Sequence, residues 1–309
     1  MAKMKLYAPG YYKDFSCIAD KCTHSCCIGW EIDIDSDTMA KYASVSHGYG
    51  KQIRDSIDVL DSPHFRLGAG ERCPHLNDAG LCRIITELGE DYLCDICREH
   101  PRFYNDTPHG KEVGLGMACE EACRIILESD DYARMMEIGE VAGEVEPADF
   151  DVIACRDTAY KILSDPSLSY TEKLSRMQKE FRVHPDCMPD ASWRDFLSSL
   201  EYLDESHRDS FLHYSSDGFT PPEWEQPLTR ALAYFLYRHG SCARDWQEFR
   251  EAVGLSLFCE RLLASIAKAE GIQNMTDFIR LARIVSEEIE YSEENTEAIR
   301  FEFSLEMVE

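Results

Sequence analysis

The chain has 309 residues, of which 44% are hydrophobic and 29% are charged; this is ordinary usage for a globular protein and excludes a disordered or fibrous chain. It carries 32 Lys and Arg against 58 Asp and Glu residues, a formal net charge of −26. Because a field of that sign repels phosphates and anionic headgroups, we expect neither nucleic acid nor a membrane surface as a partner. No run reaches the ~18 apolar residues of a membrane span, and no signal peptide precedes the first polar residues, so the sequence predicts a cytoplasmic protein.

The first third of the chain is irregular. Residues 30–35 alternate apolar and acidic side chains, which indicates a short strand or an extended loop, and Asp35 or Asp37 is placed to cap a helix that follows. Further along, residues 65–67 and the turn at 77–80 together predict a small hairpin with cysteines near both arms.

Helical patterns take over in the rest of the chain. Residues 119–127 form an amphipathic pattern, Pro227 suits a first helical position, and Asn274 is a fair N-cap with Asp277 three residues on. Two long runs place their apolar residues on one face of a 3.6-residue period: Trp246, Phe249, Val253, Leu257 and Ile266, then Phe278, Leu281, Val285 and Ile289. The acidic end, 287–309, interleaves apolar residues and is predicted to dock. We therefore predict a mainly α fold, with an irregular cysteine-rich metal-binding domain with short β elements over 1–130 and an α-helical domain over 131–309.

Cysteine usage is lopsided. Ten of the 14 cysteines lie between Cys17 and Cys123. Their spacings are Cys17-x4-Cys22-x3-Cys26-Cys27, Cys73-x8-Cys82, Cys94-x2-Cys97 and Cys119-x3-Cys123. Thiolates are the natural ligands of Zn²⁺ and of iron–sulfur clusters, and close pairs let one loop supply two donors. The pattern predicts that these segments converge on metal; buried free thiols are the alternative.

Not every cysteine in these runs need be a ligand. Adjacent Cys26 and Cys27 point in different directions in a regular backbone, so they serve two sites, or one binds and the other packs. Cys123 lies one helical turn beyond Cys119 and can face the core, and Cys94 can be structural. Two histidines are further candidate ligands: His24 and His100.

Two cofactor motifs are rejected. The pattern Cys-x3-Cys-x2-Cys, which holds the cluster that cleaves S-adenosylmethionine reductively, is incomplete here, because Gly29 stands where a third cysteine would follow Cys22 and Cys26. The pair Gly114-x-Gly116 has no βαβ unit around it and is not a nucleotide-binding loop.

The first 127 residues carry a series of motifs in a fixed order. They are Tyr7-Ala8-Pro9-x-Tyr11, Phe15-Ser16-Cys17, Cys26-Cys27-Ile28-Gly29-Trp30, Ile32-x-Ile34-Asp35, Cys73-Pro74-x-Leu76, Gly80-Leu81-Cys82-x-Ile84, Cys97-x3-Pro101-Arg102, and Cys119 followed by Ala122 and Arg124. This order resembles the flagellin lysine-N-methylases, a family within the wider group of cysteine-rich zinc- or iron-chelating domains. Two positions depart from the family pattern: His100 precedes the Pro-Arg pair where an aromatic residue is usual, and Glu120 follows Cys119 in place of a proline.

The resemblance implies an enzyme, a protein lysine N-methyltransferase that methylates lysine ε-amines of flagellin with S-adenosylmethionine as donor. It also implies a cysteine-ligated iron–sulfur cluster, expected as a 4Fe–4S cluster with zinc as the alternative. Carried over position by position, the implied ligands are Cys17, Cys22, Cys26, Cys27, Cys73, Cys82, Cys97 and Cys119. The alternative interpretation of the whole chain is a non-enzymatic zinc- or iron-binding module for metal handling or protein recognition.

The residues that would hold the substrate lysine are the least defined part of the predicted site. Aromatic faces hold ammonium groups, so the candidates are Tyr11, Tyr12 and Trp30 around the first cysteines, with Asp33 to orient the amine. Ordinary packing around a metal site is the favoured alternative for the aromatic residues, and a solvated strand face or a helix cap is the favoured alternative for the aspartate.

Overall fold

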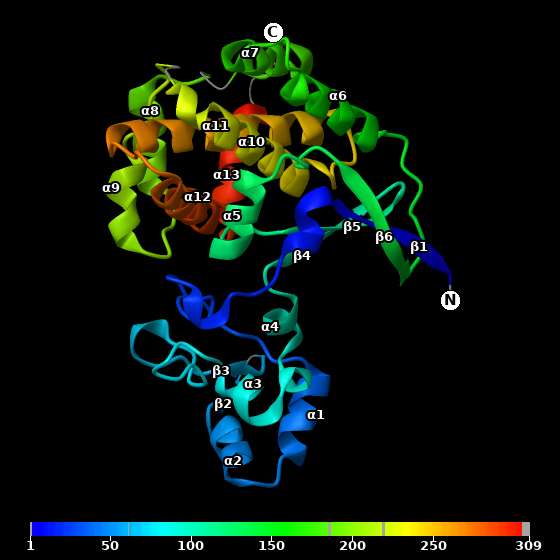
Figure 1. Cartoon of the computed structure of the whole chain (residues 1–309), viewed down its shortest axis with the longest axis vertical. Coiled ribbons are helices and arrows are strands. Elements are labelled where there is room, and N and C mark those ends of the chain that lie inside the picture. The colour runs from blue at the N-terminus through cyan, green and yellow to red at the C-terminus, as the bar shows by residue number, and fades with distance from the viewer. Residues whose placement is uncertain (1, 61, 185–186, 218–219, 305–309) are drawn as a thin grey trace. The chain divides into compact units, whose positions relative to one another are not determined.

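The computed structural model describes residues 2–60, 62–184, 187–217 and 220–304. Over these residues the chain is mainly α, as predicted. Its contacts divide it into two compact units, Met1–Phe15 with Phe103–Glu309, and Ser16–Arg102. Each unit is described by itself (Figure 1).

The larger unit contains a four-stranded sheet that the sequence analysis did not predict. Its strands lie in the order β4 (Arg102–Thr107), β5 (Gly110–Leu115), β1 (Lys3–Pro9) and β6 (Met135–Ala142). β1 runs parallel to β5 and antiparallel to β6. Gly110 has a φ of +141°, and a Cβ there would lie 2.5 Å from the Lys5 carbonyl oxygen, so only glycine fits this close approach of β5 to β1.

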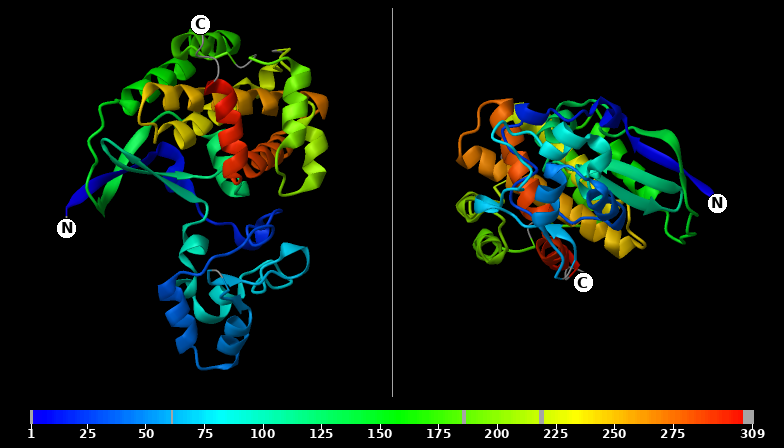
Figure 2. Two further views of the ribbon diagram at one scale, coloured as in Figure 1. Left: turned by 180° about the vertical axis from the view of Figure 1, so that it is seen from behind. Right: turned by 90° about the horizontal axis from the view of Figure 1, so that it is seen from below.

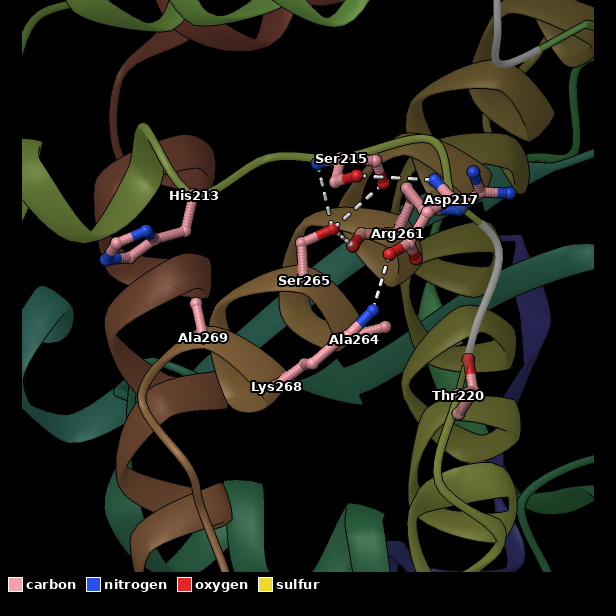
Figure 3. A pocket seen from close by; sticks show the side chains of 9 residues that line it. All are labelled: His213, Ser215, Asp217, Thr220, Arg261, Ala264, Ser265, Lys268 and Ala269. Carbon is pink, nitrogen blue, oxygen red and sulfur yellow. Dashed lines mark hydrogen bonds and ion pairs between the residues drawn. The ribbon is translucent and has the colours of Figure 1, made fainter.

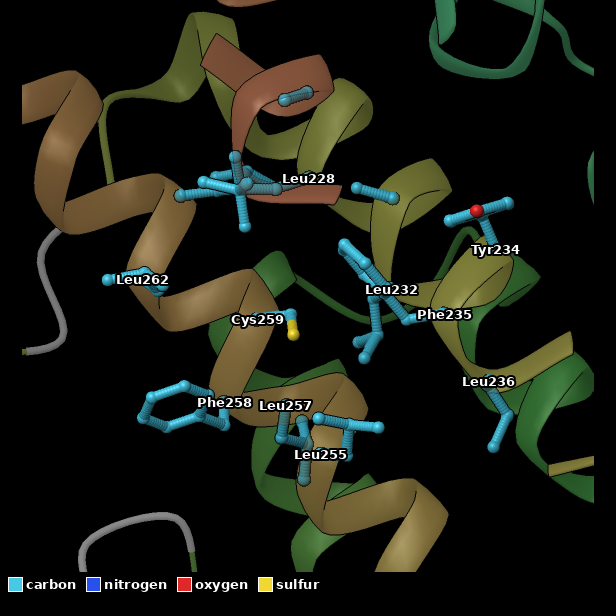
Figure 4. Close-up of a cluster of buried hydrophobic side chains, with 14 of the residues drawn as sticks. Leu228, Leu232, Tyr234, Phe235, Leu236, Leu255, Leu257, Phe258, Cys259 and Leu262 are labelled. Carbon is cyan, nitrogen blue, oxygen red and sulfur yellow. The ribbon is translucent and has the colours of Figure 1, made fainter. Parts of the chain in front are cut away.

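The helices of the larger unit form the rest of its core. They are α5 (Glu120–Glu128), α6 (Val152–Ser164), α7 (Tyr170–Phe181), α8 (Asp190–Ser199), α9 (Arg208–Phe211), α10 (Glu225–Gly240), α11 (Trp246–Ala269), α12 (Met275–Glu290) and α13 (Glu293–Ser304). Figure 2 shows the sheet at one side of these helices. α11 is the central one: from Phe249 onward it is buried on almost every side, and it packs against α10, α12 and α13. Figure 4 shows Leu232 and Phe235 of α10 beside Cys259 of α11 in this core.

The helix ends follow the predicted signals. Asn274 caps α12 by accepting a hydrogen bond from the Asp277 N–H at 3.0 Å. The predicted helix at 119–127 is α5, with Cys119 as its N-cap residue. Pro227 lies in the first turn of α10, two residues after its start. In the acidic end, Ile299 and Phe303 are fully buried and α13 packs on α11, which confirms docking for the part before residue 305; Leu305 lies outside the described residues.

A buried ion pair ties three segments of the larger unit together. The Arg156 guanidinium of α6 donates to both carboxylate oxygens of Glu112 in β5, at 2.6 and 2.8 Å, and to the Ser241 hydroxyl at 2.5 Å. The two charged side chains are only 2% and 3% exposed. Such a bidentate pair fixes the position of α6 relative to β5 strongly, because water does not reach either buried charge to solvate it if the pair separates.

The smaller unit, Ser16–Arg102, is built from short elements. It contains the helices α1 (Ser36–Ser44), α2 (Gly48–Asp55), α3 (Arg83–Leu88) and α4 (Asp95–Glu99), with strands β2 (Ile57–Asp58) and β3 (His64–Phe65). Asp35 caps α1 as predicted: its carboxylate accepts from the Thr38 N–H at 2.8 Å and from the Asp95 N–H at 2.9 Å. One carboxylate therefore joins the starts of α1 and α4.

The predicted hairpin was wrong in its pairing. The strand at Phe65 pairs with Ile57, in β2, and not with the segment after the 77–80 turn. That turn does form, with the Asn77 side-chain oxygen accepting from two backbone N–H groups, and it closes a separate one-bridge hairpin between Leu76 and Cys82. The sequence therefore contains two separate turns, one before Phe65 and one at 77–80, and their residues were interpreted as one long hairpin.

The unit boundaries differ from the predicted domains 1–130 and 131–309. The reason is the sheet: β1, β4 and β5 lie before residue 130 but pair with each other and with β6. The cysteine-rich segment is therefore inserted between strands of the larger unit. Among the helices described, none combines the length and apolar character needed to cross a bilayer.

Candidate functional site

The cysteines of the smaller unit gather around its own hydrophobic core. Cys73 and Cys94 are buried in this core, and Cys27, Cys82 and Cys97 pack against it. Backbone contacts hold their segments together: the Cys73 N–H donates to the Cys27 carbonyl at 2.8 Å. Three stretches that are far apart in sequence thus supply thiols to one place.

Cys94 and Cys97 form a hydrogen-bonded thiol pair at the start of α4. The hydrogen bond from Cys97 lowers the pKa of Cys94, with a further contribution from the Tyr42 hydroxyl 3.5 Å away. The same hydrogen bond, together with burial, raises the pKa of Cys97. The first proton to leave this pair therefore comes from Cys94, which is the more thiolate-like of the two.

Adjacent Cys26 and Cys27 differ in their exposure. Cys27 packs against the core and Cys26 is exposed. Their thiols nevertheless contact each other, and the hydrogen bond that Cys26 donates to Cys27 is the main cause that raises the pKa of Cys26.

The six thiols of Cys26, Cys27, Cys73, Cys82, Cys94 and Cys97 form what we call the thiol cluster. Burial is the main cause that raises the pKa of Cys73, to about 11, and Cys82 and Cys94 add to it electrostatically. Cys97 likewise interacts with Cys27 and Cys73. As the side chains stand, no group of three or more Cys, His, Asp or Glu residues within the described ranges has the arrangement of a metal site. The cluster is a set of neighbouring thiols, not a finished tetrahedron of ligands.

The remaining cysteines of the implied ligand set lie elsewhere. Cys17 is exposed and Cys22 half-buried, on either side of the short 3-10 helix Ala19–Lys21. Cys119 belongs to the larger unit, where it caps α5. Cys123 faces the core, with its sulfur 3.5 Å from the Ile279 carbonyl oxygen. Cys94, which the family pattern omits, lies inside the thiol cluster.

The buried histidine His75 holds the hairpin between Cys73 and Cys82 in place. The Ser56 hydroxyl donates to the Ile53 carbonyl at 2.6 Å, so its oxygen accepts from His75 Nε2 at 3.0 Å. His75 Nδ1 then accepts from the Tyr49 hydroxyl at 3.1 Å. Burial lowers the pKa of His75 to about 4, so the ring is neutral and both of its nitrogens are used. His75 fixes the segment between Cys73 and Cys82.

The four candidate catalytic residues divide between the units. Tyr11 is 2% exposed in the core of the larger unit, where burial raises its pKa, and Tyr12 packs against the same core. Trp30 is in the smaller unit and donates from its indole N–H to the Cys26 carbonyl at 2.8 Å. Asp33 accepts from the Ser62 hydroxyl at 3.2 Å. Tyr11 is thereby a packing residue, whereas Trp30 directly supports the thiol cluster.

Gly114 has a packing role, consistent with its rejection as part of a cofactor loop. A Cβ at Gly114 would overlap the Phe103 ring and lie 2.7 Å from the Tyr237 ring. This glycine of β5 therefore makes room for the rings of Phe103 in β4 and Tyr237 in α10.

The larger unit has a small hollow and a larger one. The small hollow, about 280 Å³, is lined by His213, Ser215, Asp217, Arg261, Ser265 and Lys268 among others (Figure 3). Lys268 is ion-paired with Asp217, and Ser265 bonds both the N–H and the carbonyl of Ser215. The polar groups of this hollow therefore bind one another.

The larger hollow measures about 700 Å³ and has a buried charge network at its inner wall. Glu290 there has a fully buried side chain and accepts from His239 Nε2 at 2.8 Å and from the Tyr234 hydroxyl at 2.9 Å. Sequence analysis missed this network. The signal for it was a basic pair, Arg238 and His239, directly after the apolar run 231–237 of the same helix.

Comparison with known proteins gives the decisive observation. The flagellar biosynthetic protein FliU of Salmonella muenchen is 29% identical over 147 residues, which are 45% of this chain and 85% of that protein. Lysine-N-methylases of Salmonella choleraesuis and Salmonella typhimurium are 29% and 28% identical over 144 residues, 44% of this chain. The chain is similar to the lysine-N-methylases.

This similarity confirms the resemblance that the motifs indicated. The match covers 36% of each lysine-N-methylase, so the shared region is about a third of those proteins and somewhat under half of this chain. No family model matches the chain, and no solved structure matches it.

Proposed function

We propose that the chain is a protein lysine N-methyltransferase that methylates lysine ε-amines of flagellin, with S-adenosylmethionine as the methyl donor. Its similarity to proteins named lysine-N-methylase supports a methyltransferase-type function. The name of FliU, a flagellar biosynthetic protein, supports a flagellar substrate. The observation that carries the proposal is the agreement of these names with the ordered motifs of the first 127 residues.

The reaction sets clear demands on the site. A lysine nitrogen must lose its proton before it attacks the methyl carbon; a C–N bond then forms as the C–S bond of the sulfonium breaks, and the sulfur keeps the electron pair. This is an in-line displacement, so catalysis depends on alignment and on the exclusion of water rather than on electron transfer. Acidic groups near the site favour the binding of the cationic lysine side chain and of the cationic donor alike.

We also propose that the smaller unit holds an iron–sulfur cluster, of the 4Fe–4S type, with Zn²⁺ as the alternative. The thiol cluster fits such a group in donor type and number, because five thiols lie in or against one small core and Cys26 contacts one of them. Five cysteines are common to the thiol cluster and to the ligand set implied by the family resemblance: Cys26, Cys27, Cys73, Cys82 and Cys97. They are the ligands we favour, with Cys94 as a sixth candidate. A bound group would supply folding energy by clipping three distant segments together.

A non-enzymatic metal-binding module is the second candidate function. The thiol cluster favours it independently, since neighbouring thiols in a small unit serve metal handling as well as catalysis. Methyl transfer distinguishes the two functions.

The first experiment mixes the purified chain with S-adenosylmethionine and unmodified flagellin. We expect mass steps of about 14 Da, one methylene each, on flagellin lysines, and none when the donor is omitted. If neither flagellin nor another lysine-rich protein gains mass, the enzyme proposal fails and the metal module stands.

The second experiment measures metal in anaerobically purified protein. We expect a brown protein with iron and sulfide, and loss of both in Cys73→Ser and Cys97→Ser. Cys155→Ser, in α6 of the larger unit, is the matched control and should keep its metal content. Equal metal content in all three variants would contradict the ligand proposal.

A further inference from the structure

The larger hollow is a cavity with walls from four parts of the larger unit. Its volume, about 700 Å³, is within the range of ligand sites in proteins. The walls come from β4, the end of α10, the first turns of α11, and α13 with the end of α12. Its aromatic and charged lining residues are Phe103, Tyr104, Arg238, His239, Glu248, Glu251, Glu290, Glu293, Glu297, Arg300 and Phe301.

The basic groups of the cavity are already matched by carboxylates. The Arg238 guanidinium lies 3.1 Å from Glu290, and Arg300 lies 4.0 Å from Glu251. Burial alone would raise the pKa of Glu290, but Arg238 and the hydrogen bond from His239 outweigh it and lower that pKa. The inner wall is therefore an ionised, internally neutral network.

Two carboxylates at the mouth are not matched. Glu293 and Glu297 are exposed, lie four residues apart on α13, and both line the cavity. Within the described part of the chain, no cation pairs with either one. Like charges at this spacing on a helix repel each other, so the pair costs stability unless a cation from outside joins it.

Aromatic rings flank these carboxylates. Phe301 is 58% exposed and Tyr104 is 47% exposed, which is unusual for large apolar side chains on the wall of a cavity. The cavity already shows how such rings are used: the Arg238 guanidinium lies 4.9 Å from the centroid of Phe103. The Lys111 ammonium also lies 5.8 Å from the ring of Tyr104. Ring faces at this site attract cations.

We propose that this cavity binds the lysine side chain of a protein substrate, with the ammonium group between Glu293, Glu297 and the ring of Phe301. The argument is charge complementarity: an excess of carboxylates and exposed aromatic faces suits a long apolar stem that ends in a cation. The inference rests on the proposed function for its choice of substrate, but its test measures binding and does not require methyl transfer.

The test uses the full chain and a fluorescently labelled peptide with three lysines among glycines and serines. A second peptide carries norleucine in place of lysine, which keeps the stem and removes the charge. We expect the lysine peptide to bind more tightly, and added salt to weaken it. In the double variant Glu293→Gln/Glu297→Gln, binding should weaken by ~10-fold, because two exposed carboxylates are lost at the site.

Two further variants serve as controls. Glu223→Gln/Glu294→Gln makes the same change of net charge at exposed positions that do not line the cavity, and it should keep the affinity of the unchanged chain. Phe301→Leu keeps an apolar side chain but removes the ring, and it should weaken lysine binding ~3-fold without affecting the norleucine peptide.

The outcomes separate the two proposals. Equal binding of both peptides, no binding of the lysine peptide, or equal losses in the two double variants would each overturn the cavity assignment. If methyl transfer to flagellin proceeds unchanged in Glu293→Gln/Glu297→Gln, the enzyme proposal stands and the cavity assignment falls. If lysine binding depends on these carboxylates but no methyl transfer occurs, the reverse holds.

Discussion

Replacing Arg156 tests the buried ion pair of the larger unit. Arg156→Met keeps the length of the side chain but leaves the Glu112 carboxylate, 3% exposed, without its two hydrogen bonds of 2.6 and 2.8 Å. An uncompensated buried charge of this kind costs about 3–5 kcal/mol of the free energy of unfolding. The Ser241 hydroxyl also loses a partner, which adds about 1 kcal/mol.

The double variant gives the internal comparison. In Arg156→Met/Glu112→Leu no charge remains buried, so we expect a loss well below that of Arg156→Met and a coupling energy of several kcal/mol. Urea unfolding followed by tryptophan fluorescence reports this, since Trp193, Trp224 and Trp246 all lie in the larger unit.

Two results would refute the reasoning. One is a loss of less than about 1 kcal/mol in Arg156→Met, which would mean that water or another cation reaches Glu112. The other is a double variant that loses the sum of the two single losses, which would mean that the pair is not coupled.

Three further predictions concern stability. Burial raises the pKa of Glu260 to about 7, against the opposing hydrogen bond from Tyr170, so the neutral carboxyl favours the folded state at low pH. The larger unit should lose about 3 kcal/mol as the pH rises from about 4.5 to about 7, and Glu260→Gln should flatten that profile in urea unfolding. Asp35→Ala removes the cap that joins the starts of α1 and α4, and should lower the stability of the smaller unit by about 2 kcal/mol in thermal unfolding. Gly254→Ala puts a methyl group into the buried ring of Phe303, and should cost about 1–2 kcal/mol although alanine is the better helix former.

The opposite outcomes are equally specific. Parallel pH profiles for the unchanged chain and Glu260→Gln would mean that Glu260 is not the titrating group. Asp35→Asn is the control for the cap: it keeps an acceptor for one N–H, so a loss as large as in Asp35→Ala would contradict the hydrogen-bond explanation. A stabilising Gly254→Ala would show that Phe303 can move aside.

The helices could be predicted because their signals are local. The apolar spacing of Phe278, Leu281, Val285 and Ile289 describes one turn after another, and all four side chains are buried in α12. Asn274 and Asp35 were found as caps for the same reason: a cap depends on the next three residues only.

The sheet could not be predicted because its pairings are distant. β1 pairs with β5 more than a hundred residues later, and β6, with the sequence Met-Met-Glu-Ile-Gly-Glu-Val-Ala, shows no clean alternation. Contacts between the strands, such as the ion pair of Lys5 Nζ with Glu137 at 2.7 Å, join residues far apart in the sequence, so no local pattern indicates them. The unit boundary was missed for the same reason.

The candidate site was partly predictable. Clustered spacing indicated that cysteines converge, and the structure brings six of them together in the smaller unit. Spacing does not indicate which fold unit a cysteine joins, so it did not separate Cys119 from the others, and the family pattern did not include Cys94. The cavity by Glu290 is assembled from five elements, and nothing in the sequence of any one of them predicts it.

The strand β1 has a consequence for how the protein is made. Residues 3–9 are synthesised well before their partners in β5 and β6, which lie at residues 110–115 and 135–142. During translation the cysteine-rich insertion emerges in between, while β1 still lacks hydrogen-bonding neighbours. An unpaired strand invites association with other nascent chains, so cells expressing the protein rapidly should lose more of it to aggregates than slow expression does.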